Sequence, residues 1–337
     1  MRKWIIAGML GSAPAFALTV ISNPSAFVAP PGTAILNQSG LTVDGIVKLI
    51  TTFGSTSYGC TGALLADHYD ILTAAHCVDP NANGVLPNSA TAYFYTSTEG
   101  NFSRSAVSYA VNPGWNGDSF FGGDLALIRL NLLVPGDVPG YNLYNGTGEL
   151  TLSSGSTPVI TLAGYGLSGL GTTGESSSSY PFGTRRQGLN RYDTTADTFG
   201  GSSGVLLGDF DDGTTTHDAF GYGSVFPNTD WDIVDLNSEV MLAHGDSGGP
   251  SFLNGQIVGV HSFLTCFSTL ANPNACAVPP AVSPSLNSSF GQIYGDMRVS
   301  SYATWITQNE VPEPGTLMML IPAMGLLLAA RRLGTNG

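Results

Sequence analysis

The segment Gly245–Pro250 (GDSGGP) is the stretch of the chain that decides its fold. Glycines on both sides of Ser247 allow a tight turn, which presents the hydroxyl and directs the amides of Gly245 and Ser247 toward one point. A serine presented in this way can attack a carbonyl, provided that a base takes its proton and N–H donors stabilise the oxyanion. The segment therefore predicts a serine nucleophile whose base lies elsewhere in the chain.

Two other segments supply the partners that such a serine needs. Leu72–Cys77 (LTAAHC) places His76 at the exit of an expected strand, and Gly123–Ile128 (GDLALI) places Asp124 directly before an apolar strand. Alone, each residue has an ordinary explanation, as a surface or core histidine, a turn aspartate or a glycine-rich loop. Because all three occur together, they predict a catalytic triad of His76, Asp124 and Ser247.

In the order His, Asp, Ser, these segments resemble the trypsin/chymotrypsin family of serine proteases, from about Ile35 to Asn309. The resemblance implies an all-β fold of two antiparallel Greek-key β-barrels packed together, with a short C-terminal helix. It places His76 and Asp124 on the first barrel and Ser247 on the second.

The same resemblance implies a serine endopeptidase that hydrolyses protein or peptide substrates through an acyl-enzyme and requires no cofactor or metal. Gly245 and Ser247 would form the oxyanion hole, and Ser262 would support the buried Asp124. The alternative is a catalytically silent surface or matrix binding protein on the same fold.

Short apolar stretches between turn signals agree with an all-β chain, of which only 10% of residues are charged. Expected strands in the first half are Ile46–Thr51, Gly62–Leu65, Ile71–Ala74, Thr91–Tyr95, Ala106–Val111 and Leu125–Leu130. Those in the second half are Val159–Ala163, Leu189–Asp193, Gly204–Leu207, Ala219–Tyr222, Ser251–Leu253 and Ile257–Ser262. We expect barrel one over about 35–148, barrel two over about 158–309, and a short closing helix over Val299–Ile306.

The chain has four cysteines, Cys60, Cys77, Cys266 and Cys276. An even number in an exported chain favours disulfides over a metal site, since no CxxC or His/Cys cluster is present. Three pairings are possible, and Cys60–Cys77 with Cys266–Cys276 needs the shortest loops. The family resemblance also implies the pair Cys60–Cys77.

The N-terminal end has the pattern of a signal peptide. A basic start is followed by an apolar run from Trp4 to Leu18, and Ala15–Ala17 has the small-x-small form of a cleavage site. The run is short for a membrane anchor. We expect residues 1–17 to be a signal peptide.

The C-terminal end, residues 311–337, joins Val311–Pro314 (VPEP) to an apolar run over Leu317–Ala330 and two arginines. The run is shorter than the roughly 20 residues of a spanning helix. The order of these parts resembles the PEP-CTERM sorting tail of Gram-negative bacteria, which implies processing by an exosortase-type enzyme and transient membrane association. A simple anchor is the alternative. The expected location is outside the cell or at the cell surface or outer membrane.

The formal net charge is −13, and the tails contribute four of the eleven basic residues. A surface this acidic repels nucleic acid and anionic lipid. We expect a monomer that binds no nucleic acid.

Activation in the family uses a new N-terminus that pairs with the acid before the nucleophile, here Asp246. Ile35 lies 25 residues ahead of Cys60, close to the family spacing. The resemblance therefore suggests cleavage between Ala34 and Ile35, with residues 18–34 as a possible propeptide and 35–310 as the peptidase domain. The alternative is that Ile35 merely enters the first strand.

The resemblance assigns the specificity pocket to Met241, Leu242, His261, Ser262, Phe263 and Leu264. Met241 replaces a trypsin-like aspartate, so a preference for arginine or lysine is not expected. Leu264 is expected to narrow the pocket for small or medium apolar side chains. His261 matches a carboxylate-binding histidine of the glutamate-specific branch, whose hydroxyl partner is replaced by Leu242, so an acidic preference is the alternative.

Two departures from the family remain. Ala243 stands where the family usually has a cysteine, so the disulfide from the nucleophile loop to the pocket wall is missing. Asp209–Gly213 (DFDDG) lies in an insertion and is interpreted as a hairpin turn, with calcium binding at Asp209–Asp212 as the alternative.

Overall fold

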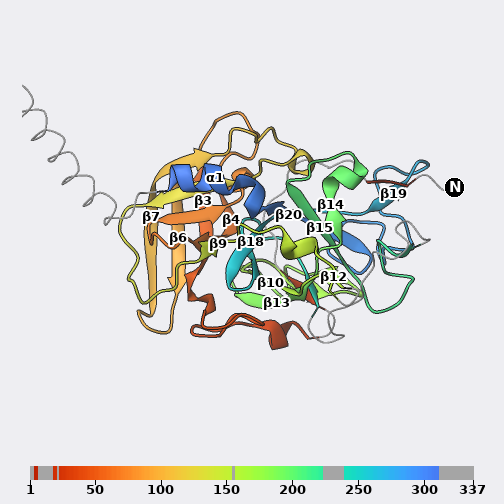
Figure 1. The fold of residues 1–337 in the computed structure, drawn as a ribbon, viewed down its shortest axis with the longest axis horizontal. Helices are drawn as coiled ribbons and strands as arrows, with labels where there is room; N and C mark the ends of the chain where they lie inside the picture. Colours follow the sequence, from red (N-terminus) through yellow and green to blue (C-terminus); the bar gives the residue numbers. More distant parts are fainter. Residues whose placement is uncertain (1–3, 7–17, 21–22, 154–155, 223–238, 311–337) are drawn as a thin grey trace, which may run out of the picture.

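The computed structural model describes residues 4–6, 18–20, 23–153, 156–222 and 239–310, and within them it is built mainly of β-strands with one α-helix. The strands fall into two groups that follow one another along the chain (Figure 1). The predicted fold class, mostly β with barrels and a short C-terminal helix, is confirmed.

The first group is a closed six-stranded barrel with the order β3-β4-β5-β8-β7-β6. Its strands are β3 (Ile46–Phe53), β4 (Thr56–Leu64), β5 (Asp70–Thr73), β6 (Ser89–Tyr95), β7 (Asn101–Val111) and β8 (Ala126–Leu130). All neighbours are antiparallel. Closure leaves no exposed sheet edge, and alternate side chains fill the interior.

The second group centres on a sheet with the order β13-β10-β17-β18-β20-β15-β14. These strands are β10 (Ile160–Gly164), β13 (Arg186–Asn190), β14 (Thr194–Thr195), β15 (Val205–Phe210), β17 (Pro250–Leu253), β18 (Gln256–Thr265) and β20 (Gln292–Arg298). Strand β9 (Asn142–Leu143) pairs in parallel with β18 at the crossing between the two groups.

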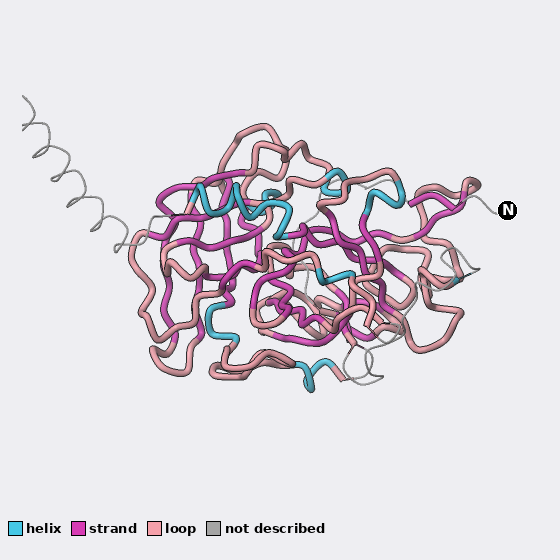
Figure 2. Tube along the Cα trace, viewed as in Figure 1, coloured by secondary structure: helices cyan, strands magenta, loops and turns pink. Residues whose placement is uncertain are grey.

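Short elements complete the described chain, and the loops that join them are long and numerous (Figure 2). The remaining strands are β1 (Trp4–Ile6), β2 (Thr19–Val20), β11 (Gly169–Leu170), β12 (Gly174–Glu175), β16 (Val240–Met241) and β19 (Phe267–Thr269). The 3₁₀ helices are η1 (Pro24–Phe27), η2 (Val43–Gly45), η3 (Ala75–Cys77), η4 (Ser119–Phe121), η5 (Gly148–Leu150) and η6 (Ala196–Phe199).

Helix α1 (Val299–Asn309) closes the described chain and packs its buried Val299 and Ile306 against both groups of strands. It lies beside β18 and β9 (Figure 1). The helix follows β20 directly, which the sequence analysis missed, because residues 292–298 lack clear alternation of apolar and polar residues.

The expected strand at Ala219–Tyr222 is wrong, because these residues form turns. Ala219 and Phe220 are buried beneath this turn, so the apolar run reflects packing of a loop rather than a strand. The other expected strands overlap observed ones, with shifts of a few residues at their ends.

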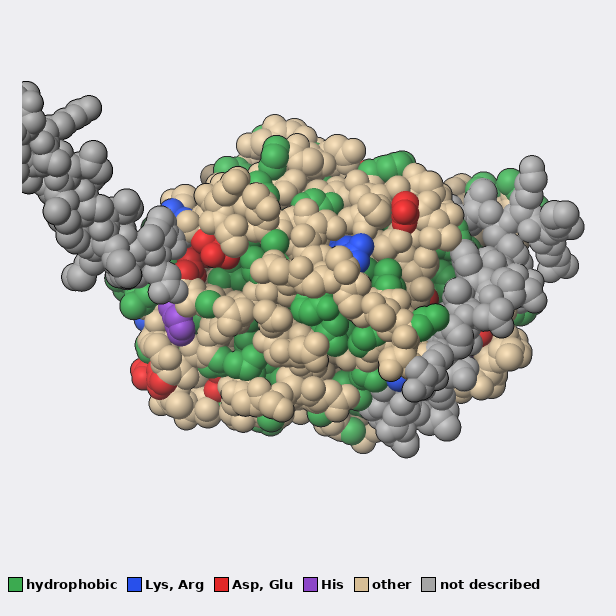
Figure 3. Space-filling view, viewed as in Figure 1, with side chains coloured by type: hydrophobic (Ala, Val, Ile, Leu, Met, Phe, Trp, Pro, Cys, Tyr) green, Lys and Arg blue, Asp and Glu red, His purple; other side chains and the backbone are tan. Residues whose placement is uncertain are grey.

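Most of the predicted signal peptide, and the whole predicted tail 311–337, lie outside the described residues. Among the described residues, no helix has the length and hydropathy needed to cross a membrane. Charged side chains are sparse on the face shown in Figure 3, as the composition suggests.

Arg185 ties the N-terminal segment and the two strand groups together. Its side chain is buried and pairs with the buried Asp44 at 3.3 Å. The same guanidinium donates to Ala29 O, Val43 O, Tyr95 O and Tyr165 Oη. One side chain thereby satisfies groups from four separated stretches of the chain.

We expect Arg185→Met to lower the free energy of unfolding by about 3–5 kcal/mol, because it leaves the Asp44 carboxylate buried without its cation. Urea unfolding measures this loss. Arg104→Met, which removes a more exposed arginine, is the matched control and should change the free energy by less than about 0.5 kcal/mol. An equal effect of the two substitutions would contradict the prediction.

Candidate active site

His76 and Asp124 are brought together by the pairing of β5 with β8. His76 lies in η3, directly after β5, and Asp124 lies just before β8, while Thr73 faces Ala126 in the ladder. His76 Nδ1 lies 2.7 Å from Asp124 Oδ2, and the His76 amide donates to Oδ1 at 2.8 Å. The two bonds fix the imidazole relative to the carboxylate.

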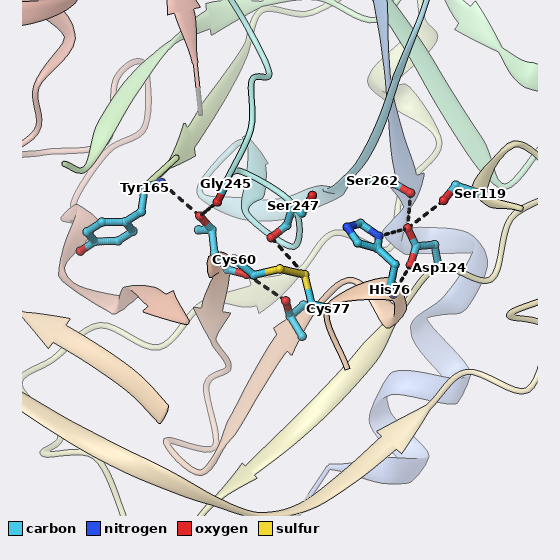
Figure 4. The surroundings of a disulfide bond; sticks show 11 residues. Cys60, His76, Cys77, Ser119, Asp124, Tyr165, Gly245, Ser247 and Ser262 are labelled. Atoms are coloured by element: carbon cyan, nitrogen blue, oxygen red, sulfur yellow. Dashed lines mark hydrogen bonds and ion pairs between the residues drawn. A yellow bond between two sulfur atoms is a disulfide. The ribbon is translucent and has the colours of Figure 1, made fainter. Parts of the chain in front are cut away.

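Further donors hold the Asp124 carboxylate in place. Ser119 Oγ donates to Oδ2 at 2.9 Å, and Ser262 Oγ donates to the same oxygen (Figure 4). Tyr302 in α1 accepts from the Gly123 amide at 2.9 Å and so holds the turn before Asp124. The support from Ser119 was not predicted, because a serine five residues before the acid has no distinctive sequence signal.

Burial and pairing shift the pKa values of His76 and Asp124 in opposite directions. Burial lowers the pKa of His76, but the charge and hydrogen bond of Asp124 outweigh it, so the pKa is raised. Burial raises the pKa of Asp124, but His76 and Ser262 outweigh it, so the pKa is lowered. The pair is therefore suited to receive a proton at Nε2 of His76.

Ser247 lies on a loop that hydrogen bonds hold against the first barrel. Its carbonyl accepts from the Thr61 amide at 2.9 Å, and Cys77 Sγ lies 3.6 Å from the same oxygen. Thr61 Oγ1 donates to Gly245 O at 2.6 Å. These contacts bring Ser247 to the His76 side of the disulfide, as Figure 4 shows. No hydrogen bond joins the Ser247 and His76 side chains in this structure.

Gly245 has φ +116° and Gly248 has φ +81°, a region that side chains other than glycine rarely adopt. A side chain on Gly248 would also collide with Thr73 and the Thr61 carbonyl. The glycines of the segment therefore allow both the turn and its close approach to the first barrel.

Two disulfides form, and disulfide bonding is confirmed. Cys60 pairs with Cys77, beside His76, and Cys266 pairs with Cys276. The sulfur atoms of Cys60 and Cys77 lie close to a His76 ring nitrogen. Since both are bonded to each other, this cluster offers no thiolate to a metal.

Glu175 holds the other side of the loop that carries Ser247. Its Oε2 accepts from the His244 amide at 2.9 Å, and Oε1 pairs with His244 Nδ1. Leu167 donates its amide to His244 O at 2.6 Å. The sequence analysis found neither partner of this pair, because they are 69 residues apart in the chain.

A narrow pocket opens beside Ser247. It is lined by Leu242, Ala243, Ser247, His261, Ser262, Phe263 and Leu264. Five of the six residues assigned to the specificity pocket are therefore brought together. The sixth, Met241, is buried in a hydrophobic cluster of the second strand group.

A second buried His–Asp pair forms one wall of this pocket. His261 is fully buried and its Nδ1 lies 3.0 Å from Asp296 Oδ1. Asp296 Oδ2 accepts from Tyr192 Oη and Ser251 Oγ, each at 2.6 Å. His261 Nε2 has no hydrogen-bond partner among the described residues.

The carboxylates of Asp209, Asp211 and Asp212 accept hydrogen bonds from nearby residues. Asp209 Oδ2 accepts from the Ala219 amide, and Asp211 Oδ1 accepts from the Gly213 amide. Asp212 accepts from Thr214 and pairs with His217.

Ile35 is part of the folded core. Its amide donates to Leu41 O at 3.0 Å and its side chain is buried in the core shared by both strand groups. The neighbouring Ala34 carbonyl accepts from Gln187 Nε2 at 2.9 Å. The peptide bond before Ile35 is therefore held on both sides by folded structure.

Comparison with known proteins gives a family match and a structural likeness. Residues 46–181 match the family model described as Trypsin. A solved structure titled HL collagenase has a TM-score of 0.48 and 20% sequence identity, covering 82% of this chain and 98% of its own. No curated protein matches this chain.

Proposed function

We propose that this chain, whose family-model match supports a trypsin-like serine protease, is a secreted endopeptidase with His76, Asp124 and Ser247 as its triad. The observation that carries the proposal is the His76–Asp124 pair, in which the buried Asp124 carboxylate also accepts from Ser119 and Ser262, beside the loop of Ser247 with its flanking glycines. An ion pair with only a structural role would not need to lie beside a serine that a glycine-rich turn presents.

The reaction follows from the roles of these groups. His76 takes the proton of Ser247 as Oγ attacks a peptide carbonyl, and the Gly245 and Ser247 amides stabilise the oxyanion. His76 then donates the proton to the leaving amine, and an acyl-enzyme remains. Water, activated by His76, hydrolyses the ester. Asp124 stabilises the imidazolium at each stage.

A fluorophosphonate probe separates this function from that of a silent binding protein on the same fold. An activated Ser247 attacks the phosphorus and becomes labelled, whereas an unactivated serine does not. Mass spectrometry of a proteolytic digest should therefore find the label on Ser247. Absence of the label would favour the binding role.

We also propose that the protein is exported, acts as a monomer on protein substrates and carries a C-terminal tail that an exosortase-type enzyme processes. The sequence patterns of residues 1–17 and 311–337 support this part of the proposal. Mass determination of the protein recovered from intact cells and medium tests whether residues 1–17 are removed and whether the tail is processed.

We expect the pocket to prefer small or medium apolar side chains before the scissile bond, because Leu242, Phe263 and Leu264 line a narrow space. The unpartnered Nε2 of His261 favours a second candidate, a glutamate whose carboxylate would bind there. A peptide library decides between them: cleavage after Val or Leu at least about 10-fold faster than after Glu supports the apolar preference. Dominant cleavage after Glu that is lost in His261→Val would support the acidic preference instead of the apolar one.

A further inference from the structure

The peptide group that joins His244 to Gly245 carries one of the two amides assigned to the oxyanion hole. Because a trans peptide group is planar, its C=O and N–H point in opposite directions. If this plane turned over, the His244 carbonyl would replace the Gly245 amide and would repel the oxyanion. Gly245, at φ +116°, has little backbone restraint of its own. The orientation of this peptide group therefore depends on contacts from neighbouring segments.

One hairpin supplies such contacts on both sides of His244. The Leu167 amide donates to the His244 carbonyl at 2.6 Å, and Glu175 Oε2 accepts from the His244 amide at 2.9 Å. Leu167 precedes β11, Glu175 lies in β12, and the register pairs Gly169 with Glu175. Since the His244 carbonyl is directed at Leu167, the Gly245 amide points away from the hairpin.

The hairpin is itself fixed to the rest of the second strand group. Strand β11 pairs in parallel with β2, and the Glu175 amide donates to the Asn287 carbonyl at 3.0 Å. The Glu175 side chain is only 11% exposed. The loop 243–249 contains no cysteine, since the disulfides are Cys60–Cys77 and Cys266–Cys276. Hydrogen bonds to fixed neighbours, rather than a covalent link within the loop, therefore hold His244.

We propose that Glu175 is a positioning residue for the oxyanion hole: by holding the His244 amide, it keeps the next peptide group in the orientation that presents the Gly245 amide to the substrate. A carboxylate acceptor makes this hydrogen bond stronger than a neutral acceptor would. The other carboxylate oxygen, Oε1, pairs with His244 Nδ1 and so fixes the side chain of Glu175 as well. This inference rests on the proposed function and adds how the chain holds one oxyanion donor.

Glu175→Met tests the role, because methionine has a similar length but no strong acceptor. We expect kcat to fall about 10- to 100-fold, while KM changes less than about 2-fold, since an oxyanion donor acts mainly in the transition state. Steady-state hydrolysis of a peptide substrate by the exported enzyme measures both constants. Glu99→Met, which removes an exposed glutamate of the first barrel, is the matched control and should keep the parental values.

The conservative substitution Glu175→Gln should restore kcat to within about 3-fold of the parent, because its Oε1 can accept from the same amide. Glu175→Ala removes the acceptor without adding a different side chain, and it should lose the same factor as Glu175→Met. A further pair of variants separates the two contacts of Glu175. The loss caused by Glu175→Met should be equal whether residue 244 is His or is changed by His244→Ala, because that change leaves the amide in place.

A peptide aldehyde and the corresponding alcohol supply a readout that a merely structural role would not move. Ser247 Oγ adds to the aldehyde carbon and its proton passes to His76, so the former carbonyl oxygen becomes an oxyanion in the hole. The alcohol binds without forming this bond. Glu175→Met should weaken the aldehyde by the same factor as kcat/KM and leave the inhibition constant of the alcohol within about 2-fold of the parental value.

The outcomes separate this inference from the proposed function. Parental kcat in Glu175→Met, equal weakening of the aldehyde and the alcohol, or no recovery in Glu175→Gln would overturn the inference while Ser247 of the parent still reacts with the fluorophosphonate. A parent in which the probe does not label Ser247 would instead overturn the proposed function.

Discussion

Ser247→Ala is expected to lower kcat/KM by about 10⁵–10⁶-fold, the largest effect of any single substitution in this chain. The substitution removes the oxygen that forms the acyl-enzyme and leaves the carbonyl contacts of the loop with Thr61 and Cys77 untouched. The folded structure should therefore persist while covalent catalysis is lost. Steady-state hydrolysis of a peptide substrate by the correctly processed enzyme measures the change.

The matched control is Ser177→Ala, which alters an exposed serine of the glycine- and serine-rich loop. It should retain full activity, and both variants should unfold at the temperature of the parent. A Ser247→Ala enzyme within about 100-fold of the parent would show that another residue acts as the nucleophile.

Asp124→Asn is expected to lower kcat/KM by about 10⁴-fold, because an amide can neither hold the required tautomer of His76 nor stabilise its charged form. The substitution should also move the pH profile. Burial lowers the pKa of His76, and in the parent the charge of Asp124 outweighs that effect. Without the charge, the pKa falls.

Catalysis requires neutral His76, so kcat/KM rises as the pH increases through the pKa of that group. The midpoint of this rise should lie at lower pH in Asp124→Asn than in the parent. Measurement of kcat/KM from pH 5 to pH 10 tests both the expected fall in kcat/KM and the expected shift of the midpoint. Asp137→Asn removes an exposed charge instead and should change neither the rate nor the midpoint. An unchanged midpoint in Asp124→Asn would mean that Asp124 does not set the pKa of His76.

Short local segments of the sequence were sufficient to predict the candidate catalytic residues. His76, Asp124 and Ser247 each stand in a short segment whose turn and strand character is visible in the residues themselves. The strands of the first barrel were also predicted, because apolar runs of four to eight residues bounded by turns carry their own signal. Pairing of β5 with β8 then brings two of these residues into contact.

Support for the candidate site came from residues that the sequence could not connect. Glu175 reaches His244 across 69 positions, whereas the contact of Ser262 with Asp124, across 138 positions, was predicted only through the family resemblance. Such pairs depend on how two strand groups meet, which no local pattern reports. The strand β20 and the turn at Ala219–Tyr222 were missed for a related reason, since burial there comes from tertiary packing and not from alternation.

The sequence by itself determined the candidate nucleophile segment, the disulfide-forming cysteines and the mainly β character of this protein, because each depends on neighbouring residues. The tertiary structure decided which groups surround the candidate site and where the N-terminal segment lies. Strand β2 is held between β11 and β16, strands that begin about 150 and 220 residues later in the chain. The burial of the Asp246 carboxyl, which raises its pKa, likewise comes from tertiary packing and not from its neighbours in the chain.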